Sequence, residues 1–225
     1  MLELLKEYQS SWISGIEITL LLTVGGVIFG GLLALFLTIL KVLKVPVISK
    51  LIDLYLFIIR GTPFLVQLYI IYYGPLQFAS ISHSMIGPLL QSAYFCAFLT
   101  LSLNTSAYTT ALFYGAIENL PQGEIIAAEA LGMRKLSILI KIILPRMFKR
   151  ILPAYSNEVL MVLKCTALVS SISIMEIMGT TRQVMSDSYE VIPSLLIAGV
   201  IYVIISFLIG ISFKWFISRN KYQAA

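Results

Sequence analysis

Residues 126–150 read IAAEALGMRKLSILIKIILPRMFKR and lie between two long apolar stretches of a very apolar chain. Six of the sixteen basic residues fall in this segment: Arg134, Lys135, Lys141, Arg146, Lys149 and Arg150. Its Ile, Leu, Ala and Met residues nevertheless recur at roughly helical spacing, which indicates amphipathic helix rather than a polar loop. We predict two short helices that meet at Gly132, within a segment, 121–150, that Pro121 opens.

The composition around this segment indicates a membrane protein. The 225 residues are 59% hydrophobic and 12% charged, whereas soluble domains carry about 25% charged residues. Apolar runs long enough to cross a bilayer can be placed at 12–40, 56–79, 91–117, 151–175 and 191–217. The sequence therefore predicts an all-α, polytopic helical bundle of about five membrane helices, with residues 1–225 forming a single transmembrane domain.

The basic residues are distributed very unevenly between the two predicted sides of the membrane. Twelve lie on one side, namely Lys41, Lys44 and Lys50, the six of residues 126–150, and Lys214, Arg219 and Lys221. Only Lys6 and Arg182 lie opposite them. Because positively charged loops stay in the cytoplasm, the amino terminus and the loops around 80–90 and 176–190 are expected outside, and the carboxyl terminus inside. This distribution of charge fits a lipid surface better than a nucleic acid. No nucleic-acid partner is therefore expected.

The first predicted span carries small residues four positions apart: Gly25, Gly26, Gly30 and Gly31. Such a pattern lets a neighbouring helix approach closely. Glycine is also simply common in membrane helices, so the pattern alone leaves both interpretations open.

One motif brings a family into view. Ala127 and Ala128, three residues, Gly132, nine residues and then Ile142-Ile143-Leu144-Pro145 resemble the EAA loop of ABC-importer permeases, whose pattern is EAA-x3-G-x9-I-x-LP. Ile126 stands where that family has glutamate, with Glu124 and Glu129 on either side. The resemblance implies that the segment docks into a cytoplasmic ATPase subunit through Ile126, Ala127, Ala128, Glu129, Gly132, Ile142, Leu144 and Pro145.

Three further stretches are similar to permeases for polar amino acids, a group with the MetI-like fold. They are RGTPFLVQLYIIYYG at 60–74, LSLNTSAYTTALFYGAIENLP at 101–121 and YSNEVLMVLKCTALVSSISIMEIMG at 155–179, and their wording most resembles arginine-transporter permeases of the M type. The resemblance covers nearly the whole chain. It implies import of a polar, basic amino acid, with arginine the first candidate, by alternating access in the bacterial inner membrane.

The resemblance also implies partners. A periplasmic or surface-tethered binding protein would deliver the substrate, and two ATPase subunits would bind ATP. Five helices are too few to enclose a pathway, so a second permease subunit is expected, as a different chain rather than a second copy. The chain itself has no G-x-x-x-x-G-K-[ST] loop and no evident catalytic or metal-ligating group, so neither enzymatic activity nor a cofactor of its own is expected.

Several polar residues lie within the predicted spans, where an ionisable group is unfavourable by about 2.5–3.5 kcal/mol. Such residues usually face a bundle interior or an aqueous path, which predicts a translocation pathway. The candidates are Arg60, Thr62, Gln67, Asn104, Tyr108, Glu158, Lys164 and Thr166. Hydrogen bonds between helices would explain each of them singly, and Arg60 would also fit a side chain that reaches lipid phosphates. Pro63 should free a backbone carbonyl that lines a cavity.

Two acids common in the family are absent here. Ala111 and Tyr114 replace the glutamate and the arginine of a motif resembling AYxAEIxRG, and Cys165 replaces the aspartate of one resembling LLKDTSLVS. Glu158 is then the remaining acid on the expected pathway, so the chain would form the weaker half of a substrate site. The alternatives from other classes are a secondary transporter or channel driven by an ion gradient, and a membrane scaffold without transport activity.

Overall fold

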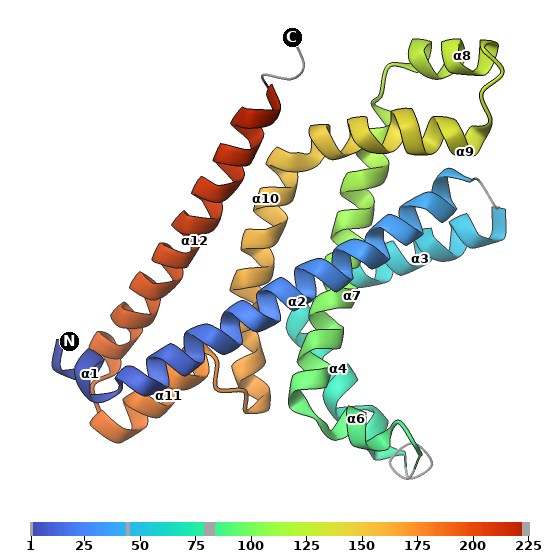
Figure 1. Ribbon diagram of the computed structural model, residues 1–225. Coiled ribbons are helices and arrows are strands. Elements are labelled where there is room, and N and C mark those ends of the chain that lie inside the picture. Colours follow the sequence, from blue (N-terminus) through green and yellow to red (C-terminus); the bar gives the residue numbers. More distant parts are fainter. Residues whose placement is uncertain (1, 44–45, 79–83, 222–225) are drawn as a thin grey trace.

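The computed structural model describes residues 2–43, 46–78 and 84–221, and every regular element in these ranges is a helix (Figure 1). In chain order they are α1 (Leu2–Glu7), α2 (Gln9–Val42), α3 (Pro46–Gly61), α4 (Phe64–Tyr73), η1 (Pro75–Gln77), α6 (Gly87–Gln91), α7 (Ala93–Glu118), α8 (Gln122–Ala130), α9 (Lys135–Ile138), η2 (Leu139–Ile143), α10 (Leu144–Val169), η3 (Ser170–Ile172), α11 (Ile177–Ser188) and α12 (Val191–Lys221). This confirms the predicted all-α bundle.

The long helices α2 and α7 pack closely at the centre of the bundle (Figure 1). A Cβ added to Gly30 would lie 2.8 Å from Thr105 Cβ and 2.9 Å from the Ser102 carbonyl oxygen. One added to Gly26 would lie 3.1 Å from Leu101 Cβ. Real Cβ atoms essentially never lie within 3.0 Å of another residue's heavy atoms, so a side chain at Gly30 would force the helices apart, and one at Gly26 would be tight. The glycines of the first span therefore serve helix packing, as one of the two interpretations held.

The second predicted span, 56–79, is not one straight helix. α3 and α4 meet at an angle of 105° around Gly61, Thr62 and Pro63. Pro63 lacks a backbone N–H and disfavours helical geometry in the residue before it, so the α3 helix ends here and a new one begins. α3 packs along α2 and α7, whereas α4 turns toward the opposite end of the bundle (Figure 1).

The segment 121–150 differs from the prediction in its second half. The first short helix is α8, but the second run continues from α9 through the π-helical turn η2 into α10 without a break. Pro145 permits this because it lies in the first turn of α10, where its missing N–H is not needed. Figure 1 shows the continuous helix lying across one end of the bundle and then turning to run along it. Pro153, inside α10, favours such a bend.

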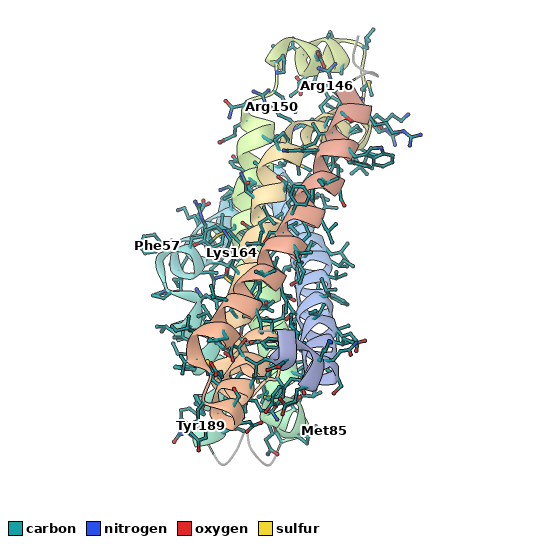
Figure 2. The ribbon with its side chains drawn as sticks, turned by 90° about the vertical axis from the view of Figure 1, so that its left-hand side faces the viewer. Phe57, Met85, Arg146, Arg150, Lys164 and Tyr189 are labelled. Atoms are coloured by element: carbon teal, nitrogen blue, oxygen red, sulfur yellow. The ribbon has the colours of Figure 1, made fainter. Side chains whose placement is uncertain are left out.

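The two ends of the bundle carry different segments. Arg146 and Arg150 mark the end formed by α8 and α9, and Met85 and Tyr189 mark the other end (Figure 2). The sequence 176–190, expected as a loop, instead forms α11, which packs against α2 and α12 at the Tyr189 end. Among the described residues α2 and α12 are apolar and long enough to cross a membrane, and the bent pairs α3–α4 and α9/α10–α11 raise the number to four.

Candidate functional site

A cavity that holds several polar side chains within a largely apolar lining lies where α4 begins, between α7 and α10. Its volume is about 240 Å³. Four of the predicted pathway residues line it, and Cys165 lies on the same wall as Glu158. The lining residues are Thr62, Pro63, Phe64, Leu101, Asn104, Thr105, Tyr108, Glu158, Met161, Val162 and Cys165. The volume is below the range of about 300–1,000 Å³ that is usual for small-molecule sites.

Gln67 holds the break between α3 and α4 in shape. Its amide nitrogen donates to the Ile59 carbonyl oxygen at 2.7 Å, and to the carbonyl and hydroxyl oxygens of Thr62 at 3.0 and 2.9 Å. Pro63 cannot donate to the Ile59 carbonyl as an ordinary helical residue would, so the side chain of Gln67 takes its place. The Asn104 amide donates to Gln67 Oε1 at 3.0 Å, which ties the break to α7.

Arg60 and Tyr108 meet at one end of this cavity. The Tyr108 hydroxyl donates to the Arg60 carbonyl oxygen at 3.4 Å, and the Arg60 guanidinium carbon lies 5.6 Å from the centre of the Tyr108 ring. Glu158 lines the cavity from α10 and makes no direct ion pair with Arg60 on α3. A cation and an anion therefore flank the cavity from opposite helices.

Four of the eight predicted pathway residues, Arg60, Gln67, Lys164 and Thr166, do not line this cavity. Arg60 and Gln67 act beside it, as described above, whereas Lys164 and Thr166 lie elsewhere on α10. Lys164 is exposed on α10 and lies about half-way between the two ends of the molecule (Figure 2). No other described residue pairs with its ammonium group. Thr166 is fully buried and donates to the Leu163 carbonyl oxygen of its own helix at 2.6 Å. Thr166 therefore lies apart from this cavity, and its hydroxyl is bonded inside its own helix.

The end of α8 depends on Gly132. Its φ angle is +75°, in the left-handed region that suits glycine. The Gly132 N–H donates to the Glu129 carbonyl oxygen at 2.9 Å, and the Met133 N–H donates to the Ala128 carbonyl oxygen at 3.1 Å. These two bonds form a Schellman motif, which closes the helix and reverses the chain toward α9. The predicted bend at Gly132 is confirmed.

The segment 121–150 buries only part of its apolar surface against the bundle. Ala128, Ile138, Leu139 and Ile143 lie in a cluster with Ala34, Phe113, Ile117, Leu120, Met147 and Ile151. Ile126, Leu131, Leu136 and Ile140 remain exposed, by 62, 82, 60 and 55% respectively. Exposed apolar residues gathered on one segment mark it as a candidate for interaction with another surface.

The remaining residues of the EAA-like motif are either exposed or half-buried. Ala127, Glu129 and Pro145 are exposed, and Ile142 and Leu144 are half-buried. An ion pair between Arg146 and Glu124 ties α10 to α8.

A buried network at the Tyr189 end was not foreseen from the sequence. Glu176 is fully buried at the start of α11, accepts from the Gly179 N–H at 2.8 Å and accepts from the Tyr202 hydroxyl at 2.8 Å. The Thr19 hydroxyl oxygen accepts from the Ile177 N–H at 3.2 Å. The network joins α2, α11 and α12. The sequence signal for this helix cap was Glu176, an acidic residue three positions before Gly179 at the start of α11.

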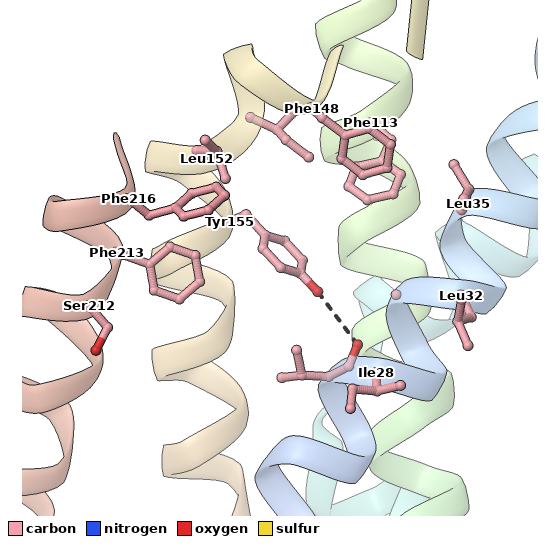
Figure 3. A pocket seen from close by; sticks show the side chains of 13 residues that line it. Ile28, Leu32, Leu35, Phe113, Phe148, Leu152, Tyr155, Ser212, Phe213 and Phe216 are labelled. Atoms are coloured by element: carbon pink, nitrogen blue, oxygen red, sulfur yellow. Dashed lines mark hydrogen bonds between the residues drawn. The ribbon is translucent and has the colours of Figure 1, made fainter. Parts of the chain in front are cut away.

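A larger hollow is apolar and is therefore not a candidate binding site for a polar substrate. It has a volume of about 600 Å³ and lies between α2, α10 and α12 (Figure 3). Aromatic and aliphatic side chains line it, and the Tyr155 hydroxyl donates across it to the Val27 carbonyl oxygen at 3.5 Å. A surface of this kind suits lipid chains.

The sequence matches the model of one protein family over residues 26–222, described as the binding-protein-dependent transport system inner membrane component. It is 45% identical over 201 residues to the arginine ABC transporter permease protein ArtM of Haemophilus influenzae, covering 89% of this chain and 88% of that protein. It is 41% identical over 198 residues to the octopine transport system permease protein OccM of Rhizobium radiobacter, covering 88% of this chain and 81% of that protein.

Solved structures share the fold. An amino acid ABC transporter crystallised with histidines superposes with a TM-score of 0.85 at 30% identity, covering 96% of both chains. An inward-facing structure of the methionine transporter MetNI superposes with a TM-score of 0.74 at 17% identity, covering 94% of this chain and 96% of that chain, and so shows likeness of fold alone.

Proposed function

The chain belongs to the binding-protein-dependent transport system inner membrane components, as a permease subunit of an ABC importer, and from this premise we propose that it carries a basic amino acid across the inner membrane. Arginine is the first candidate, because a permease that is 45% identical is named for it. Octopine, named for another relative, is the next.

The cavity beside the break between α3 and α4 carries this proposal. It brings Glu158 together with Thr62, Asn104 and Tyr108, and Arg60 borders it. A free amino acid has a carboxylate and an ammonium group, and a basic one has a second cation. Glu158 supplies negative charge for the cations, while Arg60 supplies positive charge for the carboxylate. An unpaired charge in this environment is strongly unfavourable, so both signs are needed.

We assign the remaining partners from the same geometry. The exposed apolar side chains around α8 fit the cleft of an ATPase subunit, and two such subunits would drive alternating access. A binding protein would deliver the amino acid at the Met85 end. The cavity is small and open, so a second permease subunit would complete it. We propose that this is a different chain, because the present one offers a single acid, Glu158, within the cavity.

The function is tested with the transporter assembled in proteoliposomes. Arginine uptake should require ATP and the binding protein, and should continue when an ionophore removes the proton and sodium gradients. Uptake that survives ATP depletion but stops with the ionophore would favour a secondary transporter. Absence of arginine and octopine uptake under both conditions would contradict the proposed substrate class.

The proposed orientation has the α8 end in the cytoplasm and the carboxyl end of α12 beside it. A single cysteine at Lys135 should react with a membrane-impermeant thiol reagent from the cytoplasmic side alone, and one at Met85 from the outer side alone. Both positions are exposed, and Met85 is 98% exposed, so access to the side chain does not limit the reaction. Reaction of both from one side would overturn this topology.

A further inference from the structure

A second polar hollow follows the cavity along α7. This groove has a volume of about 680 Å³ and lies toward the basic end of the bundle, between α2, α3 and α7. Its polar lining consists of two basic and two acidic side chains with one tyrosine: Lys41, Asp53, Arg60, Tyr114 and Glu118. No pathway role was predicted for any of these except Arg60.

One face of α7 connects the two hollows. Asn104 and Tyr108 line the cavity, and Ala111, Gly115 and Glu118 line the groove. Spacings of four, three, four and three residues put all five on one stripe of the helix. The same order holds on the facing chain, where Thr62 lines the cavity while Arg60 and Gly61 line the groove. The hollows are therefore consecutive along one track.

Arg60 and Tyr108 lie at the boundary between them. Arg60 lines the groove, Tyr108 lines the cavity, and the Tyr108 hydroxyl donates to the Arg60 carbonyl oxygen at 3.4 Å. The guanidinium carbon lies 5.6 Å from the centre of the Tyr108 ring, within the range of a cation–π contact. A positive charge at this point also repels a cationic solute that would pass from one hollow to the other.

The groove offers a binding environment for a cation. Lys41 pairs with Asp53, and its ammonium nitrogen lies 4.1 Å from the centre of the Tyr114 ring. Glu118 lies on the same wall without an ion pair among the described residues. Carboxylates beside an aromatic ring attract ammonium and guanidinium groups. The ammonium group of Lys41 makes both kinds of contact here, with Asp53 and with the Tyr114 ring.

We propose that the groove is the exit compartment for the basic amino acid, and that Arg60 with Tyr108 forms the partition between it and the central cavity. The identity of the substrate in this proposal rests on the proposed function. The partition formed by Arg60 and Tyr108 does not depend on it. Alternating access would then require the Arg60 side chain to leave the Tyr108 ring before the substrate enters the groove.

Cys165 reports on the partition, because it lines the cavity beyond Arg60. In a Cys96→Ser background, inverted vesicles containing the assembled transporter are treated with a cationic, membrane-impermeant methanethiosulfonate. Arg60→Ala should raise the rate of Cys165 modification at least tenfold, and Tyr108→Leu should act in the same direction from the other side of the contact. Lys50→Ala, an exposed basic position elsewhere on α3, is the matched control and should leave the rate unchanged.

The exit role is tested by Glu118→Gln in the uptake assay. We expect arginine uptake to slow at least threefold, with Cys165 modification at the parent rate, because the partition is intact. Unchanged modification in both Arg60→Ala and Tyr108→Leu would overturn the partition, and unchanged uptake in Glu118→Gln would overturn the exit role. A transporter that moves no amino acid at all would remove the proposed substrate, while Cys165 modification would still decide the partition.

Discussion

Replacing Gly132 with valine should abolish binding of the ATPase subunit while the permease still inserts into the membrane. Gly132 has a φ angle of +75°, where an L-residue is disfavoured by about 1–2 kcal/mol and a β-branched one by more. An added Cβ would meet no atom within 4 Å, so the penalty comes from the backbone alone. Relief of that strain breaks the hydrogen bonds that close α8 and displaces the exposed Leu131 beside it.

Gly123→Val is the matched control for this prediction. Gly123 lies on α8 as well, a Cβ there also meets open space, and its φ angle lies outside the left-handed region. We expect co-purification of the ATPase subunit to fall at least tenfold for Gly132→Val and to stay within twofold of the parent for Gly123→Val. Since tenfold corresponds to about 1.4 kcal/mol, the backbone strain alone is large enough. Normal assembly and substrate-stimulated ATP hydrolysis in Gly132→Val would rule out docking through this segment.

The parts of the fold that follow from local chemistry could be predicted. Gly132 acts through backbone geometry, which depends on residue type and local sequence. The glycines of the first span left two interpretations open, and only their packing against α7 decided between them. Residue type and spacing could not predict the 105° bend between α3 and α4. Pro63 marked the place, but a proline within a span is compatible with a mild kink. The sharp turn depends on the Gln67 amide, which replaces the lost helical bonds from eight residues away.

The candidate site divides in the same manner. Helical geometry alone separates the residues of α10, at about 100° per residue. From Glu158, Cys165 lies only about 20° away around the helix, whereas Lys164 lies about 240° away. The cavity accordingly includes the first two and excludes Lys164. The contacts of Thr62 and Tyr108 depend on how α3, α4 and α7 pack, and no spacing within one helix contains that information.

Restoring an acid at Cys165 should strengthen this subunit's part of the substrate site. Cys165 and Glu158 line the same cavity, two helical turns and about 10 Å apart along α10. A carboxylate added there would attract a guanidinium or ammonium group without crowding Glu158. At an effective dielectric constant near 20, a charge pair about 5 Å apart gains roughly 3 kcal/mol, part of which is lost to desolvation. We expect Cys165→Asp to tighten arginine binding in the assembled transporter about tenfold.

Cys165→Asn is the control of nearly equal shape, and it should leave the affinity unchanged, because it adds no charge. Glu158→Gln removes the acid that is present, and its effect distinguishes an asymmetric site from a symmetric one. If a companion permease carries the main substrate contacts, Glu158→Gln should weaken arginine binding only a few-fold. Loss of all arginine binding in Glu158→Gln, or normal uptake by this chain paired with a second copy of itself, would contradict the asymmetric site. Backbone carbonyls freed by Pro63 offer little compensation for a missing acid, since Gln67 already binds those of Ile59 and Thr62.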